Sequence, residues 1–297
     1  MTAAELHQLL SDSPGVTLVH VLPEDVFASR HIPGSCNACV YEMVFGEKVA
    51  GLVADKAAPV VVYGAGEGSL DSKVASEKLR ALGYTNVKVF DGGLAEWQAA
   101  GLPLEGDERD CGQVISDGIY LADKAQSVIR WTGRNLFNHH HGTVGLDSGE
   151  LAVVNGELRS ARFDVDMNSI VCEDLTDPTW NAMLIRHLRD ADFFDVENHP
   201  VATFVAEEAT RLEGCTEGTP THLLAGRFTL RGITQTMRVP IVVAAAGGRI
   251  TAQAQFELDR TLYGSLYGSG KFFRFLGKHV VNDHIHLHLK IHADRQA

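Results

Sequence analysis

The sequence predicts two domains of different fold class, an α/β domain with a parallel sheet and then an antiparallel β-barrel with one or two helices. The 297 residues exceed what a single hydrophobic core usually serves. Over the first hundred residues, apolar runs typical of buried strands alternate with helical segments, whereas the remainder alternates apolar and polar residues with period two. We therefore expect an N-terminal domain over residues 1–105, a linker over 106–117 and a barrel over 118–297.

The first domain shows the strand and helix alternation of a parallel sheet. We expect its strands at residues 16–21, 59–63 and 87–90, and the helices that follow them at 23–28, 72–82 and around Trp97. The strands are continuously apolar, as in a sheet covered on both faces, so helices should pack on both sides. A charged, non-periodic segment from Glu105 to Asp110 then marks the boundary.

Composition excludes several classes of partner. The formal net charge is −12 and no cluster of Lys and Arg stands out, which argues against nucleic acid and against an anionic membrane surface. Residues 1–26 lack a cationic segment followed by an apolar run, and no later segment is apolar enough to span a bilayer. We expect a cytoplasmic protein without an integral membrane segment, whose five scattered cysteines are reduced thiols.

The second domain reads as antiparallel strands with one apolar and one wet face. Phe163, Val165 and Met167 alternate with Arg162, Asp164 and Asp166, and residues 250–258 alternate in the same way. Turn signals recur at strand spacing, at residues 147–149, 155–156, 231–234 and 247–248. One helix, 178–189, interrupts them. Roughly eight strands that close into a barrel would remove the free edges and leave an apolar interior.

Several motifs of the first domain are shared with a known family. They are HIPG at 31–34, the strand ending at Tyr63 with its loop, GYTNV at 83–87, GGLAEW at 92–97 and GLP at 101–103. On these motifs, residues 1–105 resemble the rhodanese-like family. The resemblance implies that the loop after Tyr63 opens with a nucleophilic cysteine, whose persulfide is held by backbone N–H groups and a helix N-terminus.

This loop lacks the residues for that chemistry. Gly64 stands where the family has its cysteine, and His20 stands where it usually has an acidic residue. The loop consists of Gly64, Ala65, Gly66, Glu67, Gly68 and Ser69. It has no thiol and no arginine, and Glu67 would repel anions. We therefore expect no thiosulfate sulfurtransferase activity and interpret the domain as a docking or assembly module.

The second domain carries a second resemblance over essentially its whole length. The residues that carry it are Tyr120, Asp123, SVIRW at 127–131, FDVDMNSI at 163–170, residues 187–195 and 200–204, GRFTLRGIT at 226–234, DRT at 259–261 and VNDHI at 281–285. On these residues, 118–294 resemble the YceI-like family of lipocalin-like barrels. The resemblance implies binding of a polyisoprenoid lipid.

Alternation predicts which side chains face the barrel interior. The ligand-binding candidates are Trp131, Phe163, Phe193, Phe194, Phe204, Phe228 and Phe256. Phe193 and Phe194 follow the helix and are expected to close one end. The alternative is a filled barrel, in which these rings pack on one another and no ligand fits.

Histidines and two cysteines offer alternative chemistry. His139, His140 and His141 sit in an expected turn and could converge on a metal, with His279 or His284 as a third ligand, or form a solvated polar loop. In the last strand, four histidines share one parity and should form a surface or interface, as a homodimer would need, while Ile285, Leu287, Leu289 and Ile291 face inward. Cys36 and Cys39 have redox-pair spacing but also fit a half-buried strand.

Two classes of function follow. The first is a non-catalytic carrier or sensor that holds an isoprenoid or quinone-like lipid, with the first domain recruiting a partner. The second is a metal- or thiol-dependent enzyme that uses the 139–141 cluster or Cys36 and Cys39. Catalysis has less support, because neither domain shows a nucleophile paired with a base, or a phosphate-binding loop joined to a lysine.

Overall fold

A computed structural model describes residues 1–66, 68–107, 115–216 and 218–296. The chain divides into two compact units, Met1–Gly112 and Gln113–Ala297. No described helix is long and apolar enough to cross a membrane.

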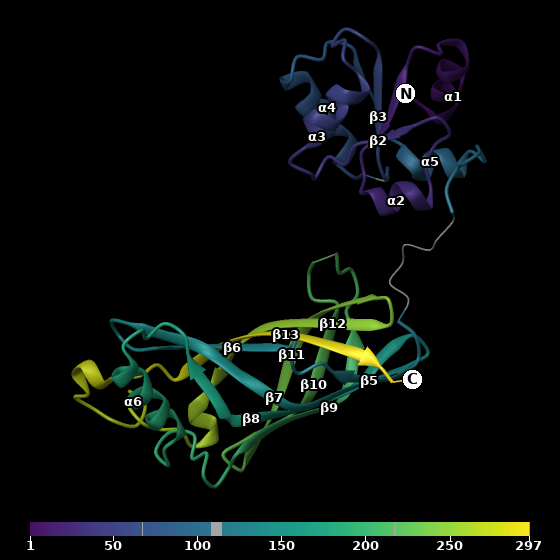
Figure 1. The fold of residues 1–297 in the computed structure, drawn as a ribbon. Helices are drawn as coiled ribbons and strands as arrows, with labels where there is room; N and C mark the ends of the chain where they lie inside the picture. Colours follow the sequence, from purple (N-terminus) through teal and green to yellow (C-terminus); the bar gives the residue numbers. More distant parts are fainter. Residues whose placement is uncertain (67, 108–114, 217, 297) are drawn as a thin grey trace. The chain divides into compact units, whose positions relative to one another are not determined.

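The first unit is a four-stranded parallel sheet in the order β2-β1-β3-β4, as the alternation predicts (Figure 1). Its strands are β1 (Thr17–His20), β2 (Cys36–Asn37), β3 (Val60–Tyr63) and β4 (Val87–Phe90). Its helices are α1 (Ala3–Asp12), α2 (Glu24–Ser29), α3 (Phe45–Leu52), α4 (Asp71–Ala81) and α5 (Gly93–Ala99). Neither the helices α1 and α3 nor the strand β2 is predicted from the sequence.

Both faces of this sheet are buried. Val60 and Val62 of β3 belong to one core cluster, with side chains of α3 and α4. Val61 and Tyr63 belong to a second cluster, with side chains of α1 and α5. Alternate residues of one strand therefore enter two cores, which explains why the strand is continuously apolar.

The second unit is an antiparallel β-barrel with eight strand positions. Its strands are β5 (Gly118–Ala122), β6 (Val128–Arg134), β7 (His139–Val154), β8 (Glu157–Cys172), β9 (Val201–Arg211), β10 (His222–Leu230), β11 (Ile233–Ala246), β12 (Arg249–Asp259) and β13 (His284–Arg295). β5 and β6 share one position, because both pair with β7 on one side and β13 on the other. The β12–β13 pairing closes the ring.

Turns and a helix set the barrel's ends. The predicted hairpin signals are tight turns whose two central residues have positive φ, at Asn155 and Gly156 and at Arg231 and Gly232. The helix α6 (Pro178–Arg189) matches its predicted bounds and is capped by the Asp177 side chain, which accepts the N–H groups of Thr179 and Trp180. Short 3₁₀ helices η1 (Arg260–Tyr263) and η2 (Gly277–His279) lie in the β12–β13 connection.

Candidate functional site

The barrel encloses an apolar cavity of ≈ 190 Å³. Every strand position contributes inward-facing side chains to its wall, together with α6 and the segments around η1. The alternation of β13 is confirmed, since Ile285, Leu287, Leu289 and Ile291 all line the cavity. The barrel therefore contains a cavity rather than a fully packed interior, and occupation of this cavity by a ligand stays a prediction.

All seven side chains predicted to face the interior border this cavity. They are Trp131 of β6, Phe163 of β8, Phe204 of β9, Phe228 of β10, Phe256 of β12, and Phe193 and Phe194 after α6. That any of them binds a ligand stays a prediction.

Three of these rings form one row across neighbouring strands. Phe204 of β9 pairs in register with Phe163 of β8 on one side and with Phe228 of β10 on the other. Such directly opposite aromatic residues stabilise a sheet and place their rings at one level of the barrel. Gly149 of β7 stands opposite Phe163, and a Cβ there would lie 2.7 Å from the Phe163 ring. A glycine at this position leaves the ring its space.

Phe193 and Phe194 directly follow α6 and share a core cluster with Tyr263 of the β12–β13 connection. Figure 1 shows α6 at one end of the barrel. The two phenylalanine rings meet edge to face with centroids 4.8 Å apart, and both are almost fully buried. Leu188 of α6 belongs to the same cluster. The pair thus seals the junction of helix and barrel while also forming part of the cavity wall.

Arg260 is a wall residue that sequence reasoning did not single out. Its buried guanidinium donates to the carbonyl oxygens of Ser265, Tyr267 and Asn282, at 2.6, 2.8 and 3.0 Å. It also lies 5.1 Å from the centroid of Phe193. Burial lowers its pKa, against the opposing effect of Asp283. Because its partners are backbone carbonyls, no residue pattern in the sequence reveals this role.

The loop after β3 is occupied by a side chain of the protein itself. The Asp71 carboxylate, which is 3% exposed, accepts the N–H groups of Ala65 and Ser72 at 3.0 and 2.6 Å. It also accepts the Ser69 hydroxyl at 2.7 Å. These N–H groups are the kind of donors that hold an anion at a helix N-terminus. Asp71 therefore supplies the anion internally.

Asp71 also limits what position 64 can carry. A Cβ added to Gly64 would lie 2.2 Å from Oδ1 of Asp71, closer than real Cβ contacts. A longer side chain at this position requires Asp71 to move. Sequence reasoning missed Asp71, although an acidic first residue of α4 after a glycine-rich loop was a usable signal. Glu67, which the sequence analysis invoked, lies outside the described residues.

The other first-unit candidates are fully or partly buried. His20 has no exposed surface, and burial, with the nearby His31, lowers its pKa to about 4. Its ring packs against Phe27 and Tyr63. Cys36 lies in β2, half-buried, and Cys39 is buried; both are free thiols.

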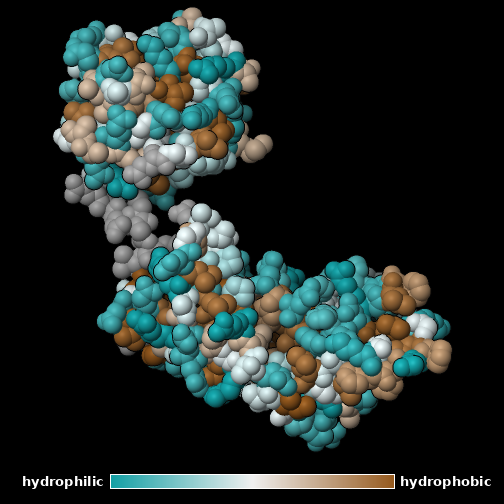
Figure 2. All heavy atoms as spheres, turned by 180° about the vertical axis from the view of Figure 1, so that it is seen from behind, coloured by the Kyte–Doolittle hydropathy of each residue, from teal (hydrophilic) through white to brown (hydrophobic). Residues whose placement is uncertain are grey.

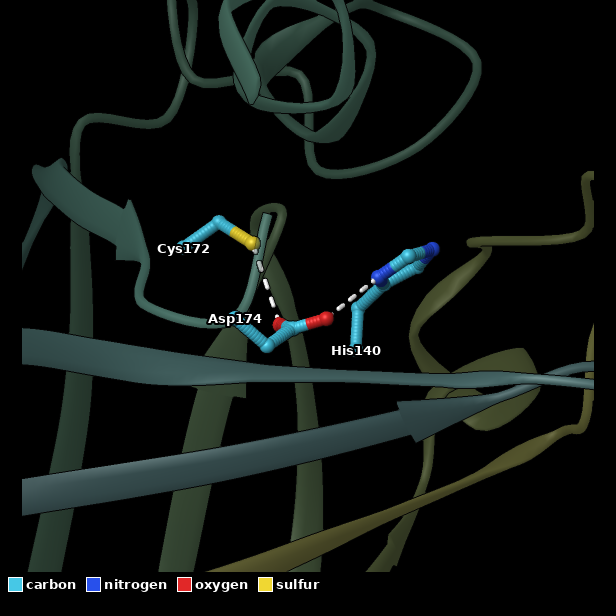
Figure 3. Close-up of side chains that lie close together, drawn as sticks. All are labelled: His140, Cys172 and Asp174. Atoms are coloured by element: carbon cyan, nitrogen blue, oxygen red, sulfur yellow. Dashed lines mark hydrogen bonds and ion pairs between the residues drawn. The ribbon is translucent and has the colours of Figure 1, made fainter. Parts of the chain in front are cut away.

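The histidine cluster differs from its prediction in both placement and partners. His139, His140 and His141 begin β7 rather than forming a turn, so the expected turn is wrong. Pairing of β7 with β8 brings Cys172 and Asp174 to this point. Asp174 Oδ2 lies 2.9 Å from His140 Nδ1, while Oδ1 accepts the His141 N–H at 2.7 Å and the Cys172 thiol at 3.2 Å (Figure 3).

Three of these side chains form a group that could hold a metal ion. One donor atom each from His140, Cys172 and Asp174 lies within 4.8 Å of the others. Burial alone would raise the pKa of Asp174, but hydrogen bonds from the His141 N–H, the His140 ring and the Cys172 thiol outweigh it and lower the pKa to about 2. Burial raises the pKa of the Cys172 thiol. Neither His279 nor His284 belongs to this group of described residues.

Comparisons with known proteins match the two units separately. Residues 120–293 match the YceI-like domain and residues 2–100 match the rhodanese-like domain. Among solved structures, BcnA of Burkholderia cenocepacia is 21% identical, covers 58% of this chain and 98% of its own, and has a TM-score of 0.45. A polyisoprenoid-binding domain from Saccharophagus degradans is 14% identical, with 61% and 100% covered and a TM-score of 0.41.

Two further relatives match the first unit. The Alr3790 protein from Anabaena sp. is 30% identical, covers 36% of this chain and 91% of its own, and has a TM-score of 0.32. The HTH-type transcriptional regulator Rv0324 of Mycobacterium tuberculosis is 34% identical over 90 residues, which are 30% of this chain. The chain spans only 38% of the length of that regulator.

Proposed function

The chain belongs to the YceI-like family, and from that premise we propose that its barrel is a non-catalytic carrier or sensor for a polyisoprenoid or quinone-like lipid. The observation that carries the proposal is the apolar cavity and the row of rings along its wall. Its volume far exceeds the roughly 10–15 Å³ that one water needs, and apolar walls offer water few hydrogen bonds. A hydrocarbon chain gains about 0.8 kcal/mol for each methylene that it buries there.

Binding of a fluorescently labelled isoprenoid to the full chain tests this proposal. Phe256→Asp places a carboxylate in the cavity wall, where burial of its charge opposes an apolar ligand. We expect this variant to bind at least about a hundredfold more weakly, a loss of roughly 3 kcal/mol. The control Gln255→Asp alters the neighbouring exposed residue of β12 and should bind as the wild type does. Equal binding by all three proteins would contradict the proposal.

The first unit is proposed to act as a docking or assembly module without sulfur transfer. Gly64 offers no thiol, and Asp71 occupies the backbone N–H groups that would otherwise hold an anionic sulfur species. A thiosulfate-to-cyanide sulfur transfer assay tests this directly. Turnover that disappears when Cys36 or Cys39 is alkylated would show that another thiol performs the chemistry.

The donor group of His140, Cys172 and Asp174, at the start of β7, favours a second candidate function, binding of a divalent transition metal. Nitrogen, sulfur and carboxylate ligands together suit Zn²⁺ and similar ions, which would replace the protons now shared among His140, Cys172 and Asp174. Titration of the full chain with Co²⁺ tests this site through the charge-transfer absorption of a cobalt–thiolate bond. The band should vanish in Cys172→Ser and persist in Cys215→Ser. A wild type without the band would exclude the site.

A further inference from the structure

The connection between η1 and β13 exposes an unusual number of aromatic side chains. Phe272, Phe273 and Phe275 are 55%, 47% and 104% exposed. The β6–β7 turn adds Leu136 and Phe137, at 63% and 76%. We call these five residues the aromatic patch.

The two segments of the aromatic patch are joined by backbone contacts. Asn135 forms a β-bridge with Val281, and the Asn282 N–H donates to the carbonyl of Arg134 at 2.8 Å. The Val281 N–H in turn donates to Gly268 at 2.8 Å. Figure 2 shows hydrophobic residues gathered at the end of the barrel that carries α6 and the β12–β13 connection. A cluster of large apolar side chains of this kind usually marks an interaction surface.

The fold itself gives no reason for Phe275 to stand where it does. Its backbone has φ +60°, a left-handed conformation that is uncommon for a bulky residue and costs on the order of 1–3 kcal/mol. Its side chain is fully exposed, so packing does not repay that cost. Strain without a folded-state benefit indicates a role outside the fold.

The connection that carries Phe272, Phe273 and Phe275 is basic in its sequence. No acidic residue occurs between Asp259 and Asp283, although the whole chain carries a net charge of −12. Lys271 is used internally, since its Nζ lies 2.7 Å from Asp259 Oδ2. Arg274 and Lys278 are exposed, and no carboxylate of the described residues forms an ion pair with them. The net charge of −12 therefore concealed these two exposed basic residues.

The same connection also forms part of the cavity wall. It begins at Arg260 and ends at Val281 and Asn282, all three of which line the cavity. Tyr267 of the connection packs on His187 of α6 with ring centroids 4.4 Å apart. The exposed aromatic residues thus belong to the segment that bounds the cavity at the α6 end.

We propose that the aromatic patch docks the barrel on an anionic lipid bilayer. Phe272, Phe273 and Phe275 enter the interface between headgroups and acyl chains, and Arg274 and Lys278 contact lipid phosphates. Aromatic residues prefer this interface, and each basic residue near an anionic surface contributes about 1 kcal/mol. The docking itself does not depend on the proposed function. Its purpose does, because docking would place the cavity next to the membrane in which an apolar lipid resides.

Flotation of the full chain with vesicles tests docking separately from ligand binding. Vesicles of phosphatidylcholine with one fifth phosphatidylglycerol should capture the wild type, and pure phosphatidylcholine vesicles should capture much less. The double variant Phe272→Ser, Phe275→Ser should lose at least about tenfold in vesicle affinity, because two exposed rings leave the interface. The matched control Tyr41→Ser, Met43→Ser removes two large exposed side chains from the first unit, 67% and 100% exposed, and should bind normally.

Two double variants that each remove two basic side chains complete the test. Arg274→Ser, Lys278→Ser should lose binding to the anionic vesicles, whereas Arg238→Ser, Lys290→Ser on β11 and β13 should not. All variants should keep the wild-type melting temperature and take up the fluorescent isoprenoid in solution, so that a failure of docking and a failure of ligand binding are distinguishable. A wild type that ignores both kinds of vesicle would overturn the proposal. So would a concentration-dependent dimer that is lost in the phenylalanine variant without any vesicle binding.

Discussion

The β3–α4 loop and the barrel cavity are two potential binding sites, and they differ in whether the protein fills them with its own side chains. The loop is filled by the Asp71 carboxylate, whereas the cavity remains open. The difference follows from the chemistry of the walls. Backbone N–H groups directed into a buried loop need an acceptor, so without an external anion an internal one stabilises the fold. Apolar walls leave no hydrogen-bonding group unsatisfied, so a cavity loses only dispersion contacts when it is empty.

Removal of Asp71 should have the largest effect, because it takes away the side chain that fills the β3–α4 loop. Asp71→Ala leaves the N–H groups of Ala65 and Ser72 and the Ser69 hydroxyl without their acceptor, and should cost the first unit roughly 3–5 kcal/mol. Hydrogen exchange of the β1 and β3 amides, read by mass spectrometry, measures the loss. Sulfate should restore part of it by entering the emptied loop. The control Asp91→Ala removes an exposed carboxylate and should change stability by less than about 0.5 kcal/mol.

The pH dependence of the first unit follows from His20. Burial, with His31 nearby, lowers its folded-state pKa to about 4, from 6.5 in the unfolded chain. Between these values the unfolded state binds more protons, so stability rises as the pH increases from about 4 to 6.5 and is constant above. This shift of the His20 pKa makes the first unit about 3 kcal/mol more stable above pH 6.5 than below pH 4. Denaturant unfolding between pH 4 and 7 measures it, and His20→Phe should flatten the profile. An unchanged slope in this variant would assign the pH dependence to another group.

Truncation of a cavity ring sharpens the comparison from the barrel side. In a filled core, Phe→Ala typically costs 3–5 kcal/mol. Phe228 already borders empty space, so we expect Phe228→Ala to cost only about 1–3 kcal/mol in denaturant unfolding, while it weakens isoprenoid binding. A loss of about 3–5 kcal/mol in the free energy of unfolding, with unchanged isoprenoid binding, would indicate that the Phe228 ring packs the core and contacts no ligand.

The smallest expected effect is on sulfur transfer. Gly64→Cys should show no thiosulfate sulfurtransferase turnover, because Asp71 lies in the space that the new side chain needs. The combination of Gly64→Cys with Asp71→Ser removes that clash and frees the N–H donors. A thiol that becomes alkylated faster in the double variant than in the single one would support this account. Equal reactivity would show that Asp71 does not control the loop.

Periodicity predicted both folds because it reports which face of an element is buried. It located the inward rings of the barrel, such as Phe163, Phe204 and Phe228, before their register was known. It missed α1 and α3, and it missed β2, which has two residues and no pattern to detect. The capping box of Thr2 and Glu5 was the available signal for α1.

The candidate sites were less accessible where they depend on tertiary register. Asp174 meets His140 only because β7 and β8 pair, and the two lie 34 positions apart. Asp71 was more accessible, because an acidic residue at the start of α4 after a glycine-rich loop is a local signal. The exposed basic residues beside the aromatic patch, Arg274 and Lys278, escaped notice because net charge averages over the whole chain, while a surface depends on which residues lie together.

Native mass spectrometry of the full chain, produced without an affinity tag and never exposed to detergent, tests the central claim most directly. The account predicts a second mass series for the wild type, heavier by one hydrocarbon-rich molecule that extracts into organic solvent. Phe256→Asp should lack this series and Gln255→Asp should retain it. A wild type that carries only its own mass, or an adduct shared equally with Phe256→Asp, would contradict the claim that the cavity holds an apolar ligand.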